Sequence, residues 1–148
     1  MQPGSPSAVS KSLWTGRILS GLAALFLLLD GIMHMAKPAP VVKAFAELGY
    51  PLVLAVTLGI VELVCVILYA IRRTAMVGAI LLTAYLGGAI AVQLRVGNPL
   101  LSQALFPVYV ALALWAGLYL RDERARAILS ARPQLFTGES EFDFRQAR

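Results

Sequence analysis

The chain has 148 residues, of which 59% are hydrophobic and only 14% are charged. Soluble domains carry about a quarter charged residues, so this composition excludes an ordinary soluble fold and indicates a single membrane domain. The net charge is +5, but the basic residues flank apolar runs instead of forming a patch, which excludes a nucleic-acid-binding protein. The single cysteine, Cys65, also excludes a disulfide relay, which needs paired cysteines.

Four apolar windows are long enough to cross a bilayer core of about 30 Å, which takes roughly 20 residues per helix. They cover residues 17–36, 51–71, 75–94 and about 104–120. Because the connecting segments are short, neighbouring spans must run antiparallel, as in an up-down-up-down bundle. The sequence therefore predicts an all-α integral membrane four-helix bundle at 17–126. A polar N-terminal tail at 1–16 precedes it, and a flexible polar C-terminal tail at 127–148 follows it.

The segment between the first two spans has a helical pattern of its own. "KPAP" ends the first span, because proline cannot continue a helix. "VVKAFAEL" then places Val41, Phe45 and Leu48 on one helical face, and Lys43 and Glu47 on another. This pattern predicts a short helix in the membrane interface, which "GYP" ends before the second span.

Small residues recur every fourth position along the third span: Ala75, Ala79, Thr83, Gly87 and Ala91. Such stripes let helix backbones approach closely in a membrane. We therefore assign Gly78, Gly87 and Gly88 to helix packing. The packed helices can belong to one chain or to two copies of it in a homo-oligomer. The alternative is that these glycines leave room for a ligand. A shorter stripe occurs on the first span, at Gly16, Ser20 and Ala24.

The distribution of basic residues predicts the topology, because cytoplasmic loops carry an excess of Lys and Arg. One side of the spans has eight such residues: Lys11, Arg17, Arg72, Arg73, Arg121, Arg124, Arg126 and Arg132. The other side has Lys37, Lys43 and Arg95. Both termini are therefore expected in the cytoplasm, with the loops at 37–50 and 95–103 facing outward.

Ionisable residues are costly inside a bilayer and generally face the interior of a bundle. Here they are Asp30, His34 and Glu62. Counting about 1.5 Å per residue places Asp30 roughly 9 Å inside the outer end of its span and Glu62 about 16 Å below Pro51. The inner half of the spans is almost wholly apolar. We therefore predict an outward-opening pocket lined by Asp30, His34, Glu62, Thr83, Tyr85, Gln93 and Arg95.

Within this pocket Asp30 is expected to contact His34, one helical turn away, or Arg95. Glu62 is expected to accept a hydrogen bond from Tyr85 or Thr83. One histidine and two carboxylates are a thin ligand set, so no metal is predicted. A mostly apolar pocket with a few polar groups suits a quinone or another small ligand. Alternatively, these residues only bond across the helices and lock the bundle.

Five segments follow one another in a fixed order: "RILSGLAALFLLLDGIMH", "LGYP", "LGIVELVCVILY", "RTAMVGAILLTAYLGGAIAVQLRVG" and "WAGLYLRD". In this order they resemble the DoxX-like branch of the DoxX family of small four-span membrane proteins, over about residues 15–126. The resemblance implies a four-helix bundle in the bacterial inner membrane. Relatives in the wider family include a subunit of a thiosulfate:quinone oxidoreductase and a mycobacterial protein linked to redox defence. A eukaryotic chaperone for nicotinic receptors is a further relative.

The family positions that this chain matches are Gly31, His34, Glu62, Thr83, Tyr85, Gly87, Gly88 and Arg95. One position departs from the family pattern. Where that pattern often reads "THLR", this chain reads "VQLR", so Gln93 stands in place of a histidine. The change removes a second nitrogen ligand or proton carrier and weakens a metal or proton-relay role.

Three functions remain open, and the sequence does not decide whether the chain is an enzyme. The first is a redox-associated subunit that binds a quinone-like ligand, with the redox centre in a membrane or soluble partner, because this chain has no motif for one. The second is a non-catalytic assembly factor or structural subunit. The third, a proton-coupled carrier, is disfavoured by the apolar inner half of the spans.

Overall fold

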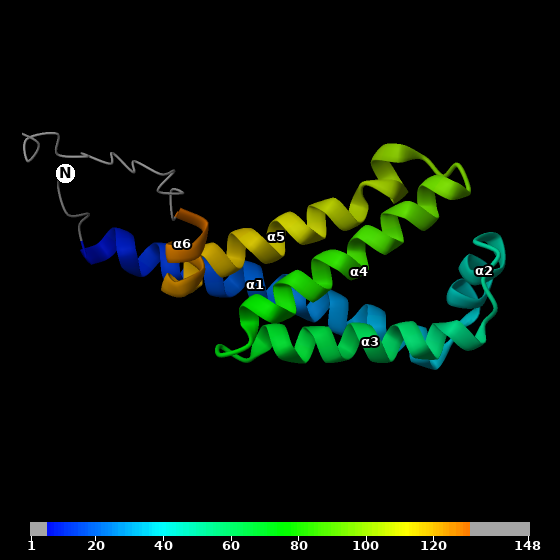
Figure 1. The fold of residues 1–148 in the computed structure, drawn as a ribbon, viewed down its shortest axis with the longest axis horizontal. Helices are drawn as coiled ribbons and strands as arrows, with labels where there is room; N and C mark the ends of the chain where they lie inside the picture. The colour runs from blue at the N-terminus through cyan, green and yellow to red at the C-terminus, as the bar shows by residue number, and fades with distance from the viewer. Residues whose placement is uncertain (1–5, 131–148) are drawn as a thin grey trace, which may run out of the picture.

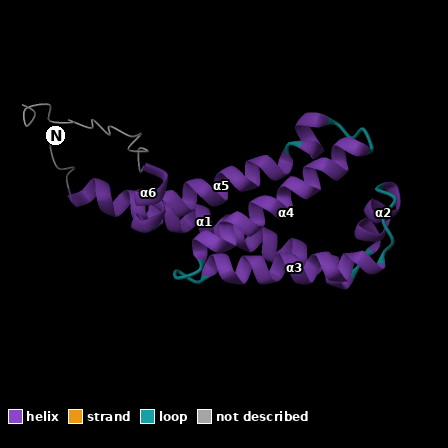
Figure 2. Cartoon of the chain, viewed as in Figure 1, coloured by secondary structure: helices purple, strands orange, loops and turns teal. Residues whose placement is uncertain are grey.

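The computed structural model describes residues 6–130, and within that range the chain is helical with no strand (Figures 1 and 2). Loops join six α-helices and one short π-helical turn, η1. In chain order the elements are α1 (Pro6–Ala36), α2 (Ala39–Glu47), α3 (Val53–Ala70), α4 (Ala75–Arg95), η1 (Leu100–Ala104), α5 (Phe106–Arg121) and α6 (Glu123–Ser130).

The four long helices form the bundle that the sequence predicts. Helices α3 and α5 each pack against both α1 and α4, so that α1 and α4 lie diagonally across the bundle. Successive long helices run in opposite directions (Figure 1). Four stretches are long and apolar enough to cross a membrane: Lys11–Ala36, Val53–Ala70, Ala75–Arg95 and Leu100–Arg121.

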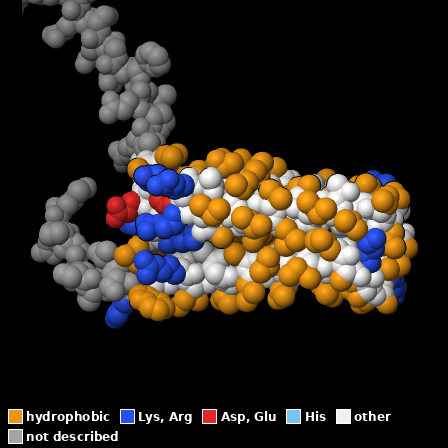
Figure 3. Space-filling model, turned by 90° about the horizontal axis from the view of Figure 1, so that it is seen from below, with side chains coloured by type: hydrophobic (Ala, Val, Ile, Leu, Met, Phe, Trp, Pro, Cys, Tyr) orange, Lys and Arg blue, Asp and Glu red, His pale blue; other side chains and the backbone are white. Residues whose placement is uncertain are grey.

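The face of the bundle seen in Figure 3 is apolar along its length. No more than 33% of any candidate span is buried inside the molecule, so most of each span faces outward. Leu22, Val64 and Leu112, from three different helices, are each more than half exposed. Exposure of such a continuous apolar surface to water is unfavourable, whereas lipid chains solvate it.

The two ends of the bundle differ in charge. Lys and Arg side chains gather at the end formed by the α3–α4 turn, the end of α5 and α6, which we call the basic end (Figure 3). Arg17, Arg72 and Arg121 meet there. The other end, which we call the α2 end, carries α2 and the loop between α4 and α5 (Figure 1). This asymmetry is the one on which the predicted topology depends.

Helices extend into both segments that the sequence predicts as tails. Helix α1 begins at Pro6, so residues 6–16 extend the first helix instead of forming a polar tail. Proline is well suited to a first helical position, since its missing N–H would have no partner there. Helix α6 takes up residues 123–130, because Asp122 breaks α5 with extended backbone and its Oδ1 accepts a hydrogen bond from the Arg124 N–H at 2.9 Å. The remainder of the predicted C-terminal tail lies outside the described residues.

The predicted loop helix is confirmed as α2. The exposed Lys43 and Glu47 side chains pair at 3.8 Å, as their spacing predicts. The apolar face turns onto the end of the bundle, where Phe45 is only 5% exposed. Gly49 ends the segment with a φ of 68°, a conformation that glycine adopts without strain.

The small-residue stripe is only partly a packing surface. A Cβ on Gly78 would lie 2.3 Å from the Tyr69 backbone nitrogen, so α3 and α4 meet there backbone to backbone. Ala79 is fully buried beside it. The predicted packing of Gly87 and Gly88 is wrong within this chain, because a Cβ on either would meet nothing within 4 Å. Helix α4 has rotated that part of its stripe away from α3 and α5.

Candidate functional site

Two glycines bring the acidic groups of different helices together. Gly31 on α1 follows Asp30 directly, and Gly59 on α3 lies one turn before Glu62. A Cβ on Gly59 would lie 2.7 Å from the Gly31 carbonyl oxygen and 3.0 Å from the His34 Cβ. The backbones of α1 and α3 therefore touch here, and the side chains on either side of the contact are forced into one cluster.

That cluster consists of Asp30, His34, Glu62 and Tyr85. His34 Nδ1 lies 3.5 Å from Asp30 Oδ2 and 3.5 Å from Glu62 Oε2. It also lies 3.0 Å from the Asp30 carbonyl oxygen, which can only accept, so Nδ1 carries a proton. The Tyr85 hydroxyl donates to Glu62 Oε2 at 3.1 Å. The predicted Asp30–His34 and Glu62–Tyr85 contacts are both confirmed.

Burial changes steeply across the cluster. The Asp30 side chain is 44% exposed, the His34 side chain 18%, and Glu62 is fully buried. Phe45 of α2 covers the imidazole edge-on, with ring centroids 5.7 Å apart. Among the described residues, Glu62 Oε1 is one of three buried side-chain polar atoms without a hydrogen-bond partner. An unpaired buried carboxylate oxygen is costly, which makes it the most unusual feature of this site.

Two of the predicted pocket residues, Thr83 and Gln93, make their hydrogen bonds outside the cluster. Thr83 Oγ1 donates to the Ala79 carbonyl and accepts from Trp115 Nε1, each at 2.8 Å, so it ties α4 to α5. Gln93 Oε1 accepts from the side chain of Asn98. Neither side chain forms a hydrogen bond to the cluster. Their role in a shared pocket therefore stays a prediction.

Arg95 supports the site from a distance. Its guanidinium donates to the Leu48 carbonyl and lies 5.5 Å from the centre of the Tyr50 ring. Both contacts hold the segment that joins α2 to α3. The predicted alternative of an Asp30–Arg95 contact is therefore wrong, because Arg95 instead contacts the segment that follows α2, the helix that carries Phe45.

Comparison with known proteins identifies a family. The model of the DoxX-like family matches residues 18–117, which include all four members of the cluster. The chain belongs to the DoxX-like family. No curated protein and no solved structure gives a significant match. Family membership and four apolar helices together make this DoxX-like chain a multi-pass membrane protein.

The cluster of this DoxX-like protein could also coordinate a single cation. Asp30, His34 and Glu62 each offer one ligand atom, and these atoms lie within 4.8 Å of one another. One imidazole nitrogen and two carboxylate oxygens suit a hard or borderline divalent ion. Three ligands from the protein would leave open positions for water. The absence of a metal therefore stays a prediction.

Sequence reasoning missed two kinds of residue. Gly59 was not singled out, although a glycine at i−3 from the acid in the second span could have suggested it. The half of the spans toward the basic end, which the sequence predicts as the inner half, is also less apolar than predicted. Tyr69 is fully buried there, with its hydroxyl 2.9 Å from Ser20 Oγ and 2.8 Å from the Leu114 carbonyl oxygen. This network ties α3 to α1 and α5.

Proposed function

We propose that this DoxX-like protein is a bacterial inner-membrane subunit that binds a quinone-like ligand at the Asp30–His34–Glu62–Tyr85 cluster. The observation that carries the proposal is the unpaired Oε1 of a fully buried Glu62. A quinol hydroxyl would donate a hydrogen bond to that oxygen, and a quinone carbonyl would accept one from it when the Glu62 carboxyl carries a proton. The exposed apolar flanks of α1 and α3 would solvate the remainder of such a ligand in lipid.

The order of exposure supports proton exchange with the ligand. Interconversion of a quinone and a quinol takes up or releases protons together with electrons. A path through Asp30, His34 and Glu62 joins a partly exposed carboxylate to a buried one by contacts of 3.5 Å each. The chain itself has no redox motif, so a membrane or soluble partner protein would supply the electrons.

The orientation follows from charge. The basic end of the bundle is proposed to face the cytoplasm, because basic residues flanking spans are retained on that side. The cluster, with α2 above it, then opens toward the outer face of the membrane. Both termini would be cytoplasmic.

Binding of decylubiquinone to the purified protein in detergent tests the proposal. We expect Glu62→Gln and Tyr85→Phe each to weaken binding about tenfold, a loss of about 1.4 kcal/mol. Glu62→Gln keeps the shape of the side chain and an acceptor for the Tyr85 hydroxyl, so its thermal midpoint should change little. Tyr85→Phe removes the donor to Glu62 and should lower its own midpoint slightly, so this variant is judged by binding. Matched controls are Glu47→Gln and Tyr109→Phe, which make the same chemical changes at exposed positions. The controls should bind as the unaltered protein does.

The alternative function, a structural or assembly subunit, predicts the opposite pattern. In that case the cluster only locks α1 to α3 and α4, because its members bond mainly to one another. Glu62→Gln would then lower the thermal midpoint. Absence of decylubiquinone binding by the unaltered protein would rule out the quinone proposal in favour of this alternative.

A further inference from the structure

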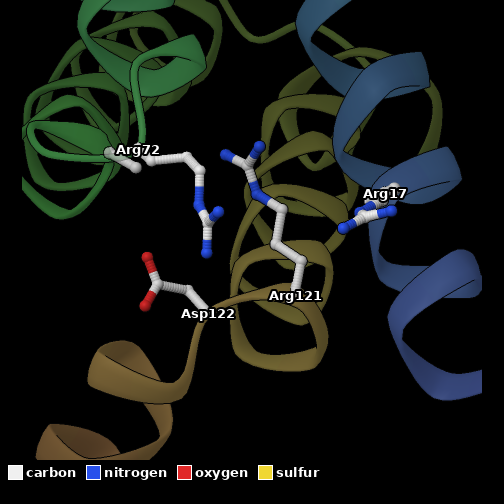
Figure 4. A pocket seen from close by; sticks show the side chains of 5 residues that line it. Arg17, Arg72, Arg121 and Asp122 are labelled. Carbon is white, nitrogen blue, oxygen red and sulfur yellow. The ribbon is translucent and has the colours of Figure 1, made fainter. Parts of the chain in front are cut away.

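A second polar site lies at the basic end, outside the cluster. A cavity of about 80 Å³ is lined by Arg17, Arg72, Ala75, Arg121 and Asp122 (Figure 4). Arg17 comes from α1, Arg72 from the α3–α4 turn and Arg121 from the last turn of α5. Thirteen residues separate Arg17 from Asp30 on α1, which is about 20 Å along the helix.

Three guanidinium groups share this cavity with one carboxylate. Arg72 and Arg17 extend toward Arg121 from opposite sides (Figure 4). Within residues 6–130, no arginine in the cavity forms an ion pair with Asp122. The Asp122 carboxylate instead accepts from the Arg124 N–H. The cavity therefore holds an excess of positive charge that no acidic side chain of the described chain neutralises.

Arg121 is held in place before any ligand binds. One of its Nη atoms donates to the Tyr69 carbonyl at 2.9 Å, and its guanidinium carbon lies 4.8 Å from the centre of the Tyr69 ring. Its Nε is buried and has no hydrogen-bond partner among the described residues. A fixed guanidinium with an unused N–H is suited to bind an anion, because the ordering cost has already been met.

The surroundings indicate an anion that comes from the membrane. Trp14, one turn before Arg17, is 63% exposed, and such indole rings are typical of the headgroup level of a bilayer. Ile18 and Ile71, next to two of the arginines, are each about half exposed and continue into the apolar exterior. Arginine binds phosphate in a bidentate manner, and basic pockets between spans bind phosphate headgroups.

We propose that this cavity binds the phosphate group of an anionic phospholipid. The phosphate would bridge α1, the α3–α4 turn and α5, and so hold the basic end together. The acyl chains would lie along the apolar exterior beside Ile18 and Ile71. This inference is independent of the proposed ligand at the cluster.

Native mass spectrometry of the purified protein with equal amounts of phosphatidylglycerol and phosphatidylcholine tests the proposal at fixed salt. Phosphatidylglycerol should be retained preferentially and should raise the thermal midpoint in mixed micelles, since a ligand of the folded state stabilises it. Arg72→Gln and Arg17→Gln should each weaken this binding about tenfold. The matched control is Arg73→Gln, an adjacent residue with the same charge change that does not line the cavity.

Three outcomes would overturn the proposal. If Arg73→Gln weakens phosphatidylglycerol binding as much as Arg72→Gln does, the attraction depends only on net charge. If inorganic phosphate at the same concentration raises the thermal midpoint equally, the site takes a soluble anion and not a lipid. If phosphatidylcholine is retained as well as phosphatidylglycerol, the cavity does not select an anion. Loss of the thermal shift in Arg72→Gln and in Arg17→Gln but not in Arg73→Gln, with unchanged midpoints in the absence of lipid, supports it.

Discussion

Gly31 and Gly59 face each other across the contact between α1 and α3, with no room for a methyl group between them. The Gly31 carbonyl would be 2.7 Å from a Cβ on Gly59, and a Cβ on Gly31 would be 2.9 Å from the Leu63 side chain. Close approach of backbones is how helices gain contact in lipid, where no hydrophobic force drives them together. Here the same contact sets the distance between His34 and Glu62.

Gly59→Ala should therefore separate α1 from α3 at the cluster. Forcing an extra carbon into a close-packed contact costs about 1–3 kcal/mol, so the thermal midpoint in detergent should fall. The matched control is Gly87→Ala on α4, where a Cβ meets nothing within 4 Å and no loss is expected. If Gly59→Ala and Gly87→Ala have the same thermal midpoint, the α1–α3 contact accommodates the extra methyl group without loss of stability.

Tyr69→Phe tests the buried network near the basic end. The change removes the hydroxyl and leaves Ser20 Oγ and the Leu114 carbonyl without this partner. Hydrogen bonds between membrane helices average about 0.6 kcal/mol and reach about 1.7, so we expect a loss of about 1 kcal/mol in unfolding free energy. Tyr109→Phe, at a half-exposed residue, should be neutral in the same denaturation assay. A neutral Tyr69→Phe would mean that the network adds nothing to stability.

The fold was predictable because hydropathy, loop length and charge determine spans and their order without details of packing. The Asp30–His34 and Glu62–Tyr85 contacts were also within reach. The first follows from spacing along one helix, and the second from the need of a buried acid for a hydroxyl donor on a neighbouring span. The rotation of each helix about its axis was not predictable. It decides that Gly78 packs whereas Gly87 and Gly88 face outward, and that Arg95 binds the Leu48 carbonyl instead of Asp30.

Arg95→Ala should release the cover over His34 without unfolding the bundle. The variant loses the hydrogen bond to the Leu48 carbonyl and the contact with Tyr50, which hold the end of α2. Amide hydrogen exchange in residues 41–50 should then become severalfold faster, whereas exchange in α3 and α4 should not change. Lys43→Ala removes only an exposed ion pair and serves as the charge-matched control. Unchanged exchange in Arg95→Ala would show that Phe45 alone anchors α2.

The proposed orientation is open to a direct labelling test, because the chain has one cysteine and it is only 5% exposed. Arg73→Cys places a thiol at the basic end, and Lys43→Cys places one on α2 at the opposite end, both at exposed positions. In intact spheroplasts a membrane-impermeant maleimide should label Lys43→Cys, and should label Arg73→Cys only after the membrane is permeabilised. The unaltered protein reports the background from Cys65. Each substitution removes a single basic residue, so the excess on the basic side persists and the insertion direction should not change. Labelling of Arg73→Cys in intact spheroplasts would show that the orientation is opposite to the one proposed. The cluster would then lie on the cytoplasmic side.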